Sequence, residues 1–185
     1  MIRVSVLTLA LLLQPITAAA EGCPEAPDHE AALQTLLSEL GRVGSEGEAQ
    51  ILNNRLWALW TDAPDEPSQA MLDQGMRMRS SYDYLGALDR FEALVNYCPF
   101  YAEGYNQRAF IRFLTEDYEA ALPDLDRALD LNPHHVGALS GKALTLHALG
   151  RKAEALIALD AALDLNPWLA ERHLRPVLLQ EMQEL

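Results

Sequence analysis

The sequence predicts an all-α fold of stacked helical hairpins, on the strength of three observations. Residues 121–133 (ALPDLDRALDLNP) and 155–167 (ALIALDAALDLNP) share ten of thirteen positions at an offset of 34. Within these stretches apolar residues recur every three or four positions, which places them on one face of a helix. Prolines at 99, 133 and 167 repeat the same interval. A fixed period of this length is typical of folds in which each unit buries its apolar face only against its neighbours.

The chain begins with the pattern of a secretory signal peptide. Arg3 precedes an apolar run over residues 4–13, and three alanines at 18–20 come just before Glu21. A basic start, a short apolar stretch and a small-residue cleavage site define such peptides, and the run is shorter than the roughly 20 residues that span a bilayer. We therefore expect a signal peptide over residues 1–20 and an exported chain. The sequence has no Asn-x-Ser/Thr site, which favours a bacterial periplasm over secretion by a eukaryotic cell.

The charge balance argues against a nucleic-acid partner. The whole chain carries 27 Asp and Glu against 14 Lys and Arg, a formal net charge of −13. Residues 1–20 contain one basic and no acidic residue, so the mature chain has 27 acidic against 13 basic side chains, a net charge of −14. Nucleic-acid phosphates require clustered cations. No later segment offers a membrane span, and we expect a monomer.

After the signal peptide the chain divides into three parts. An N-terminal segment over residues 21–67 contains a degenerate helical hairpin at 28–64, and a capping helix over residues 168–185 ends the chain. Between them lie three repeat units, 68–101, 102–135 and 136–167. Helical spacing and the Asn-Pro pairs, which end helices, predict the helix pairs 28–42 with 47–61, 68–80 with 84–97, 102–114 with 118–131, and 136–148 with 152–165. The last helix is expected to begin near Trp168, with Pro176 kinking or dividing it.

The repeat units resemble the tetratricopeptide repeat (TPR) family. That family has a period of 34, a bulky residue and then a small residue in the first helix, and an alanine followed four positions later by a bulky residue in the second. The matching positions are Met71, Tyr105 and Leu139 (bulky), Gly75, Ala109 and Ala143 (small), and Ala87 with Phe91, Ala121 with Leu125, and Ala155 with Leu159 (second helix). Departures occur where the family usually has Leu or Tyr, at Gln74, Arg108, Lys142, Met78, Arg112 and Leu146.

The resemblance implies a right-handed superhelical array whose first helices line a concave groove that binds another polypeptide. We expect this groove to hold an extended or helical segment of a partner, with an apolar floor and a few polar contacts. The groove residues expected from the register are Met76, Arg79, Asn106, Phe110, Phe113, Leu144 and His147. Two alternatives remain: a structural subunit of a cell-envelope complex that uses its convex face, and a small hydrolase with an unrecognised site.

The sequence offers no recognisable catalytic, cofactor or metal motif. The five histidines lack the spacing that places two ligands on one helix face, and we interpret His134-His135 as a solvated turn. Asp124, with its neighbours Asp126 and Asp130, is interpreted as part of a solvated helix face. Trp57 and Trp60 have two interpretations, an exposed recognition patch or, as we expect for aromatic residues at helical spacing, core.

The two cysteines, Cys23 and Cys98, have two interpretations. In an oxidising compartment we expect a disulfide that ties the N-terminal segment to the folded body. The alternative is that Cys23 is lipidated, although residues 20–22 lack the pattern that bacterial lipoprotein signals show.

Overall fold

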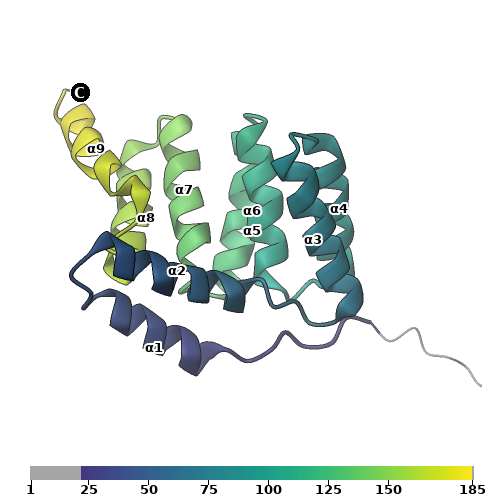
Figure 1. The fold of residues 1–185 in the computed structure, drawn as a ribbon. Helices are drawn as coiled ribbons and strands as arrows, with labels where there is room; N and C mark the ends of the chain where they lie inside the picture. Colours follow the sequence, from purple (N-terminus) through teal and green to yellow (C-terminus); the bar gives the residue numbers. More distant parts are fainter. Residues whose placement is uncertain (1–21, 185) are drawn as a thin grey trace, which may run out of the picture.

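The computed structural model describes residues 22–184, so the expected signal peptide lies outside the described residues. Every regular element of this range is helical, and six of the helices stand side by side as three antiparallel pairs (Figure 1). The predicted all-α fold is therefore confirmed. The elements are α1 (Glu30–Leu40), α2 (Glu46–Trp60), α3 (Glu66–Ser80), α4 (Tyr84–Tyr97), α5 (Ala102–Leu114), α6 (Tyr118–Leu131), α7 (Val136–Ala148), α8 (Lys152–Leu165), the short 3₁₀ helix η1 (Ala170–His173) and α9 (Leu174–Gln183). None of the helices in residues 22–184 has the length and apolarity needed to cross a membrane.

The predicted ranges of α4 to α8 agree with the structure at both ends, because local chemistry ends each helix. The second helices end two residues before a proline, because proline disfavours helical geometry in the residue that precedes it. Asn132 and Asn166 adopt extended backbone angles there. Their side-chain oxygens accept hydrogen bonds from the backbone amides of His134 and Trp168, at 3.1 and 3.0 Å, and so begin the next turn.

The turn inside each pair has the same geometry in all three pairs. Tyr82, Glu116 and Gly150, spaced by 34 residues, have φ angles of 63°, 61° and 73°. This left-handed conformation lets the next amide bond back to a carbonyl of the first helix, as Asp83 does to Met78 at 2.9 Å. Only one of the three positions is glycine, so the repeated packing imposes the turn on two side chains that disfavour it.

The repeat positions form the core between the helices of each pair. Ala87, Phe91 and their counterparts in α6 and α8 are at most 1% exposed. A Cβ on Gly75 would lie 2.5 Å from the Phe91 ring. The glycine is therefore needed because this unit has a phenylalanine where the other two have the smaller Leu125 and Leu159.

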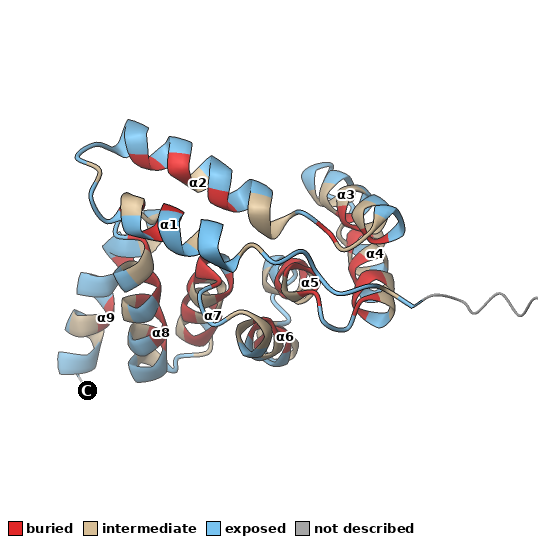
Figure 2. Ribbon diagram, turned by 90° about the horizontal axis from the view of Figure 1, so that it is seen from below, coloured by how far each residue is buried: buried red, intermediate tan, exposed pale blue. Residues whose placement is uncertain are grey.

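The predicted N-terminal hairpin forms, but it does not stack beside α3 in the way that the three pairs stack on one another. Helices α1 and α2 lie along the lower edge of the stack, across the ends of its upright helices, with α2 on the side of α3 and α5 (Figures 1 and 2). Leu40 and Leu56 are nearly inaccessible, and they belong to a cluster with Val136 of α7 and with Leu165 and Trp168 at the end of α8. The hairpin therefore buries its apolar face against the far end of the array instead of against the adjacent α3.

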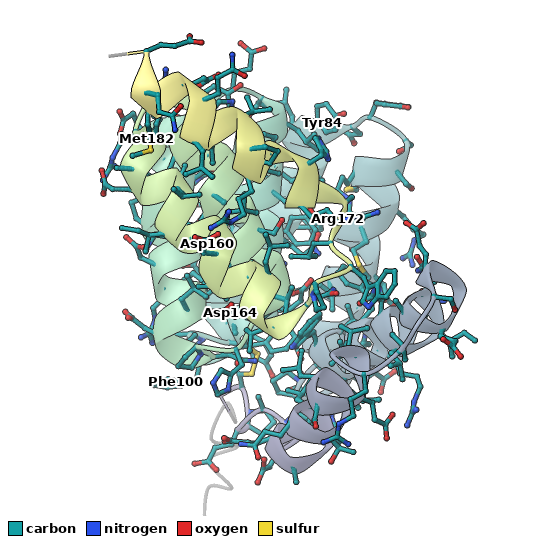
Figure 3. The ribbon with its side chains drawn as sticks, turned by 90° about the vertical axis from the view of Figure 1, so that its left-hand side faces the viewer. Tyr84, Phe100, Asp160, Asp164, Arg172 and Met182 are labelled. Atoms are coloured by element: carbon teal, nitrogen blue, oxygen red, sulfur yellow. A yellow bond between two sulfur atoms is a disulfide. The ribbon has the colours of Figure 1, made fainter. Side chains whose placement is uncertain are left out.

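The C-terminal segment caps the last pair, as predicted, but its division does not occur at Pro176. The chain turns through η1 and changes to α-helix at Leu174. Pro176 lies in the first turn of α9, where the missing amide hydrogen would have had no helical partner. Leu174 and Leu178 are buried against the cluster that contains Leu159. Figure 3 shows α9 running past α8, with Arg172 on the segment between them.

A disulfide joins Cys23 to Cys98, as predicted. The two Cα atoms are 5.1 Å apart and the residues are separated by 75 positions. The bond fixes the segment before α1 at the C-terminus of α4, where Cys98 is 1% exposed. It also leaves Cys23 without the free thiol that lipidation requires.

Replacing Cys23 with serine should lower the free energy of unfolding by about 2–4 kcal/mol, because the bond closes a long loop and so restricts the unfolded chain. Cys23 is the better site for substitution since it is only partly buried, whereas Cys98 lies in the core. Urea denaturation of the variant and of the oxidised and reduced natural chain provides the measurement. Reduced natural chain should match the variant, and two reactive thiols in protein purified without reductant would contradict the bond.

Candidate functional site

A cavity of about 310 Å³ opens among the first helices of the second and third pairs. We call it the groove. Phe110 and Phe113 of α5 and Leu144 of α7 supply apolar walls, while Arg79 of α3 and Asn106 of α5 supply polar groups. These are five of the seven residues that the sequence placed in the groove. Phe110 is 40% exposed, so part of its ring remains accessible to a ligand.

The remaining two expected residues lie elsewhere. Met76 packs against the core cluster around Phe91 and is not part of the groove lining. His147 lies in the last turn of α7, just beyond the residues that line the groove, and its Nδ1 is 4.0 Å from a carboxylate oxygen of Glu181 in α9. Lys152 approaches the same carboxylate at 3.3 Å, so α9 faces His147.

Three groove residues come from outside the repeats. Trp57 of α2, 40% exposed, lines the groove together with Leu169 and Glu171, which precede and belong to η1. Our expectation that Trp57 is core is therefore wrong. The Trp57 side chain reaches the groove because of where the hairpin packs, which the sequence did not predict. The only feature of the sequence that pointed to this role was the spacing of the two tryptophans.

Arg79 is held in place by two contacts. Its Nη1 donates to the Gln107 side-chain oxygen, and its guanidinium lies 5.1 Å from the centroid of the Phe110 ring. Burial lowers the pKa of Arg79, and the nearby Glu103 carboxylate opposes that shift.

Behind the groove lies a buried polar network of Glu103, Asn106, Gln107 and His135. The Glu103 carboxylate, in a residue 1% exposed, accepts hydrogen bonds from Asn106 Nδ2 (3.0 Å), Gln107 Nε2 (2.5 Å) and His135 Nε2 (2.8 Å). The interpretation of His135 as part of a solvated turn is wrong, since it is also 1% exposed, whereas His134 is exposed. A buried carboxylate needs such donors to compensate for lost hydration.

The two ring nitrogens of His135 have separate roles. Nδ1 accepts from the backbone amide of Ala138 at 3.2 Å and caps α7. This assigns the proton to Nε2, which donates to Glu103. The indole of Trp60 stacks on the imidazole, with ring centroids 4.8 Å apart, and the Trp60 carbonyl accepts from the Tyr101 hydroxyl at 2.8 Å. The network thus fastens the end of α2 to α5 and α7.

Burial raises the pKa of the Tyr101 hydroxyl far above its usual value. The Glu103, Asp62 and Asp73 carboxylates raise it further, because they disfavour a second negative charge nearby. Tyr101 therefore remains a hydrogen-bond donor to α2.

The Asp124 side chain is buried, so its interpretation as part of a solvated face is wrong, although Asp126 and Asp130 are exposed. It accepts from Arg108 Nε and Nη2 at 2.8 and 2.6 Å and from Arg112 Nη1 at 2.7 Å. The hydrogen bonds to Asp124 raise the pKa of Arg108. Two departures from the family pattern, both arginines, are thus explained by one aspartate in the facing helix.

Two other features of the described residues are a second cavity and one group of potential metal ligands. A second cavity, also about 310 Å³, lies between the segment before α1 and the loops that join the pairs, and it is lined in part by Phe100, His134 and Tyr101. Among residues 22–184, potential metal ligands gather only at Cys23, Asp65 and Cys98, and the two sulfurs there are already joined to each other.

Comparison with known proteins gives the same architecture. The family described as tetratricopeptide repeat matches residues 115–167. A TPR repeat-containing protein of Rhizobium etli is 28% identical over 118 residues, which are 64% of this chain and 58% of that protein. A tetratricopeptide repeat protein 36 homolog of Nematostella vectensis is 37% identical over 70 residues, 38% of each chain. This chain therefore spans less than two thirds of either relative.

Solved structures with a similar fold include complexes with peptides. The first TPR of Spaghetti (RPAP3), bound to the HSP90 peptide SRMEEVD, superposes with a TM-score of 0.61 at 20% identity, covering 63% of this chain and 93% of that one. The TPR2B domain of yeast Sti1, in a complex with an Hsp70 peptide, gives 0.58 at 23% identity, covering 64% and 98%. At these identities the likeness concerns the fold alone.

Replacing Glu103 with glutamine should lower the free energy of unfolding by about 2–3 kcal/mol, because an amide cannot accept from three buried donors without leaving one unpaired. The same substitution at Glu119, an exposed residue of α6, should change stability by less than about 0.5 kcal/mol. Chemical denaturation followed by circular dichroism measures both. Equal stability of the two variants would show that the network does not fasten the hairpin.

Proposed function

We propose that this chain, which belongs to the tetratricopeptide repeat family, is a protein-interaction scaffold that holds an extended or helical segment of a partner polypeptide in the groove. One observation carries the proposal: Trp57 and Phe110, each 40% exposed, line the same cavity although they come from separate parts of the chain. Exposed aromatic side chains gathered in a hollow are typical of binding surfaces.

The mechanism is non-covalent burial. A partner side chain that enters the groove removes apolar surface of Phe110, Phe113 and Leu144 from water, at roughly 25 cal/mol per Å². Arg79 and Asn106 provide polar contacts that orient the segment. Two structural neighbours, from Spaghetti and yeast Sti1, were solved with bound peptides, which supports this use of the fold.

The buried Glu103–His135 pair does not favour the hydrolase alternative. A carboxylate beside an imidazole is a common arrangement for acid–base catalysis. Here, however, one imidazole nitrogen caps α7 and the other donates to Glu103, so neither is available to move a proton of a substrate. We therefore propose a non-enzymatic role.

A second candidate function uses the opposite face. Leu85 of α4 and Ile157 of α8 are 79% and 70% exposed, although both are large apolar residues on second helices. A structural subunit of a cell-envelope complex would bury such residues against its neighbours.

We further propose that the chain works as a monomer in an exported compartment, most readily the periplasm. The disulfide supports the exported location, because such bonds persist in oxidising compartments and are rare in the cytosol. The apolar run after Arg3 supports export.

A photocrosslinking amino acid at position 110 should capture a specific partner in cells that make the natural protein, because the groove brings the partner against this residue. The matched control carries the same crosslinker at Ile157, on a second helix. Denaturing electrophoresis and mass spectrometry identify the adducts. We expect adducts from position 110, weakened at least tenfold when Phe113 is changed to alanine. Adducts from position 157 alone would overturn the groove and favour the second candidate.

The mature protein should begin at Glu21. Terminal sequencing and the intact mass of protein from the envelope fraction test this expectation. A mature chain that retains residues 1–20, or a chain found only in the cytosol, would refute export while leaving the groove unaffected.

A further inference from the structure

The charges around the groove are unevenly compensated. The lining contains one cation, Arg79, and one carboxylate, Glu171, while Glu103 lies directly behind Gln107. One positive charge therefore stands against two negative charges. His135 adds no positive charge to this balance, because Nδ1 accepts a hydrogen bond and so carries no proton.

The two charged side chains of the lining also differ in their contacts. Arg79 donates to Gln107, stacks on Phe110 and lies near Glu103. Glu171 is half-buried, and its side chain makes neither a hydrogen bond nor an ion pair with another residue of the range 22–184. The uncompensated charge of the groove is thus the carboxylate of Glu171.

Trp57 stands in the same lining and offers a second contact for a cation. Its side chain is 40% exposed. The neighbouring Leu56, also on α2, is 1% exposed and anchors the helix in the core. The face of an indole attracts Lys and Arg side chains. The chain as a whole has a net charge of −13, which adds long-range attraction for a basic segment.

We infer that the groove selects a polypeptide segment in which a large apolar side chain is flanked by Lys or Arg, and that Glu171 and Trp57 set this preference. The apolar side chain occupies the space between Phe110 and Leu144, and the cation lies between Glu171 and the Trp57 ring. This inference rests on the proposed function.

The test is a selection of phage-displayed random twelve-residue peptides on the immobilised mature chain, without any assumption about the natural partner. Parallel selections use Glu171→Gln, Glu119→Gln and Phe110→Ala. Glu119, which is exposed on α6, controls for the loss of one negative charge outside the groove. We expect enriched peptides to combine an aromatic or aliphatic residue with Lys or Arg on the natural chain and on Glu119→Gln, and to lose the basic residue on Glu171→Gln.

Synthetic copies of the enriched peptides then give dissociation constants by fluorescence anisotropy. Glu171→Gln should weaken binding about three- to tenfold and Trp57→Ala at least tenfold, whereas Glu119→Gln should change it less than twofold. Acidic or uncharged peptides that depend on Phe110 would overturn the inferred preference but keep the proposed function. Basic peptides that bind the natural chain and the Glu171→Gln variant equally well would also overturn the preference and keep the proposed function. If no peptide is enriched over the Phe110→Ala selection, both the preference and the groove are refuted.

Discussion

No helix pair of this chain can bury all of its apolar surface alone, and most of the structure follows from that constraint. Each pair packs its small and bulky repeat positions internally and presents further apolar residues to its neighbours, so the pairs must stack. The last pair has no further pair after it, and two other segments cover its remaining apolar surface. Helix α9 covers one side of the last pair through Leu174 and Leu178. The N-terminal hairpin packs on the same pair from its lower edge, through the cluster that includes Val136 and Leu165.

The hairpin packs on the stack to bury its own apolar surface, and in that position it also contributes a side chain to the groove. Because α2 crosses the stack on the side of the first helices, Trp57 becomes part of the cavity wall. The buried network then holds the end of α2 through the stacking of Trp60 on His135. Buried polar groups rarely add stability over an apolar core, but they penalise every alternative arrangement that would leave them unpaired. Glu103 therefore specifies where the hairpin lies as well as contributing to the charge near the groove.

How much of this the sequence could predict depended on where each contact partner lies in the chain. The helices α4 to α8 were predictable to the residue, because Pro99, Pro133 and Pro167 follow the ends of α4, α6 and α8, and the repeat supplies the register of α5 and α7. Five groove residues followed from the same register. The burial of Asp124, by contrast, depends on two arginines in the facing helix, and that of His135 depends on Glu103, which lies 32 residues earlier in the chain. A polar residue on a helix appears solvated until its distant partner is known, so periodicity alone assigns it wrongly.

The departures from the repeat pattern are consequently more informative about this chain than the matches. Matching positions, such as Ala121 and Leu125, are buried in the core between the paired helices and follow from the repeat pattern alone. The arginines at 108 and 112 are explained by their ion pairs with Asp124, and Gly75 is explained by the space that the Phe91 ring occupies. Glu171 is the exception, since none of the described side chains accounts for a half-buried carboxylate at that place. A partner that supplies a cation would give this carboxylate the oppositely charged neighbour that it lacks among the described residues.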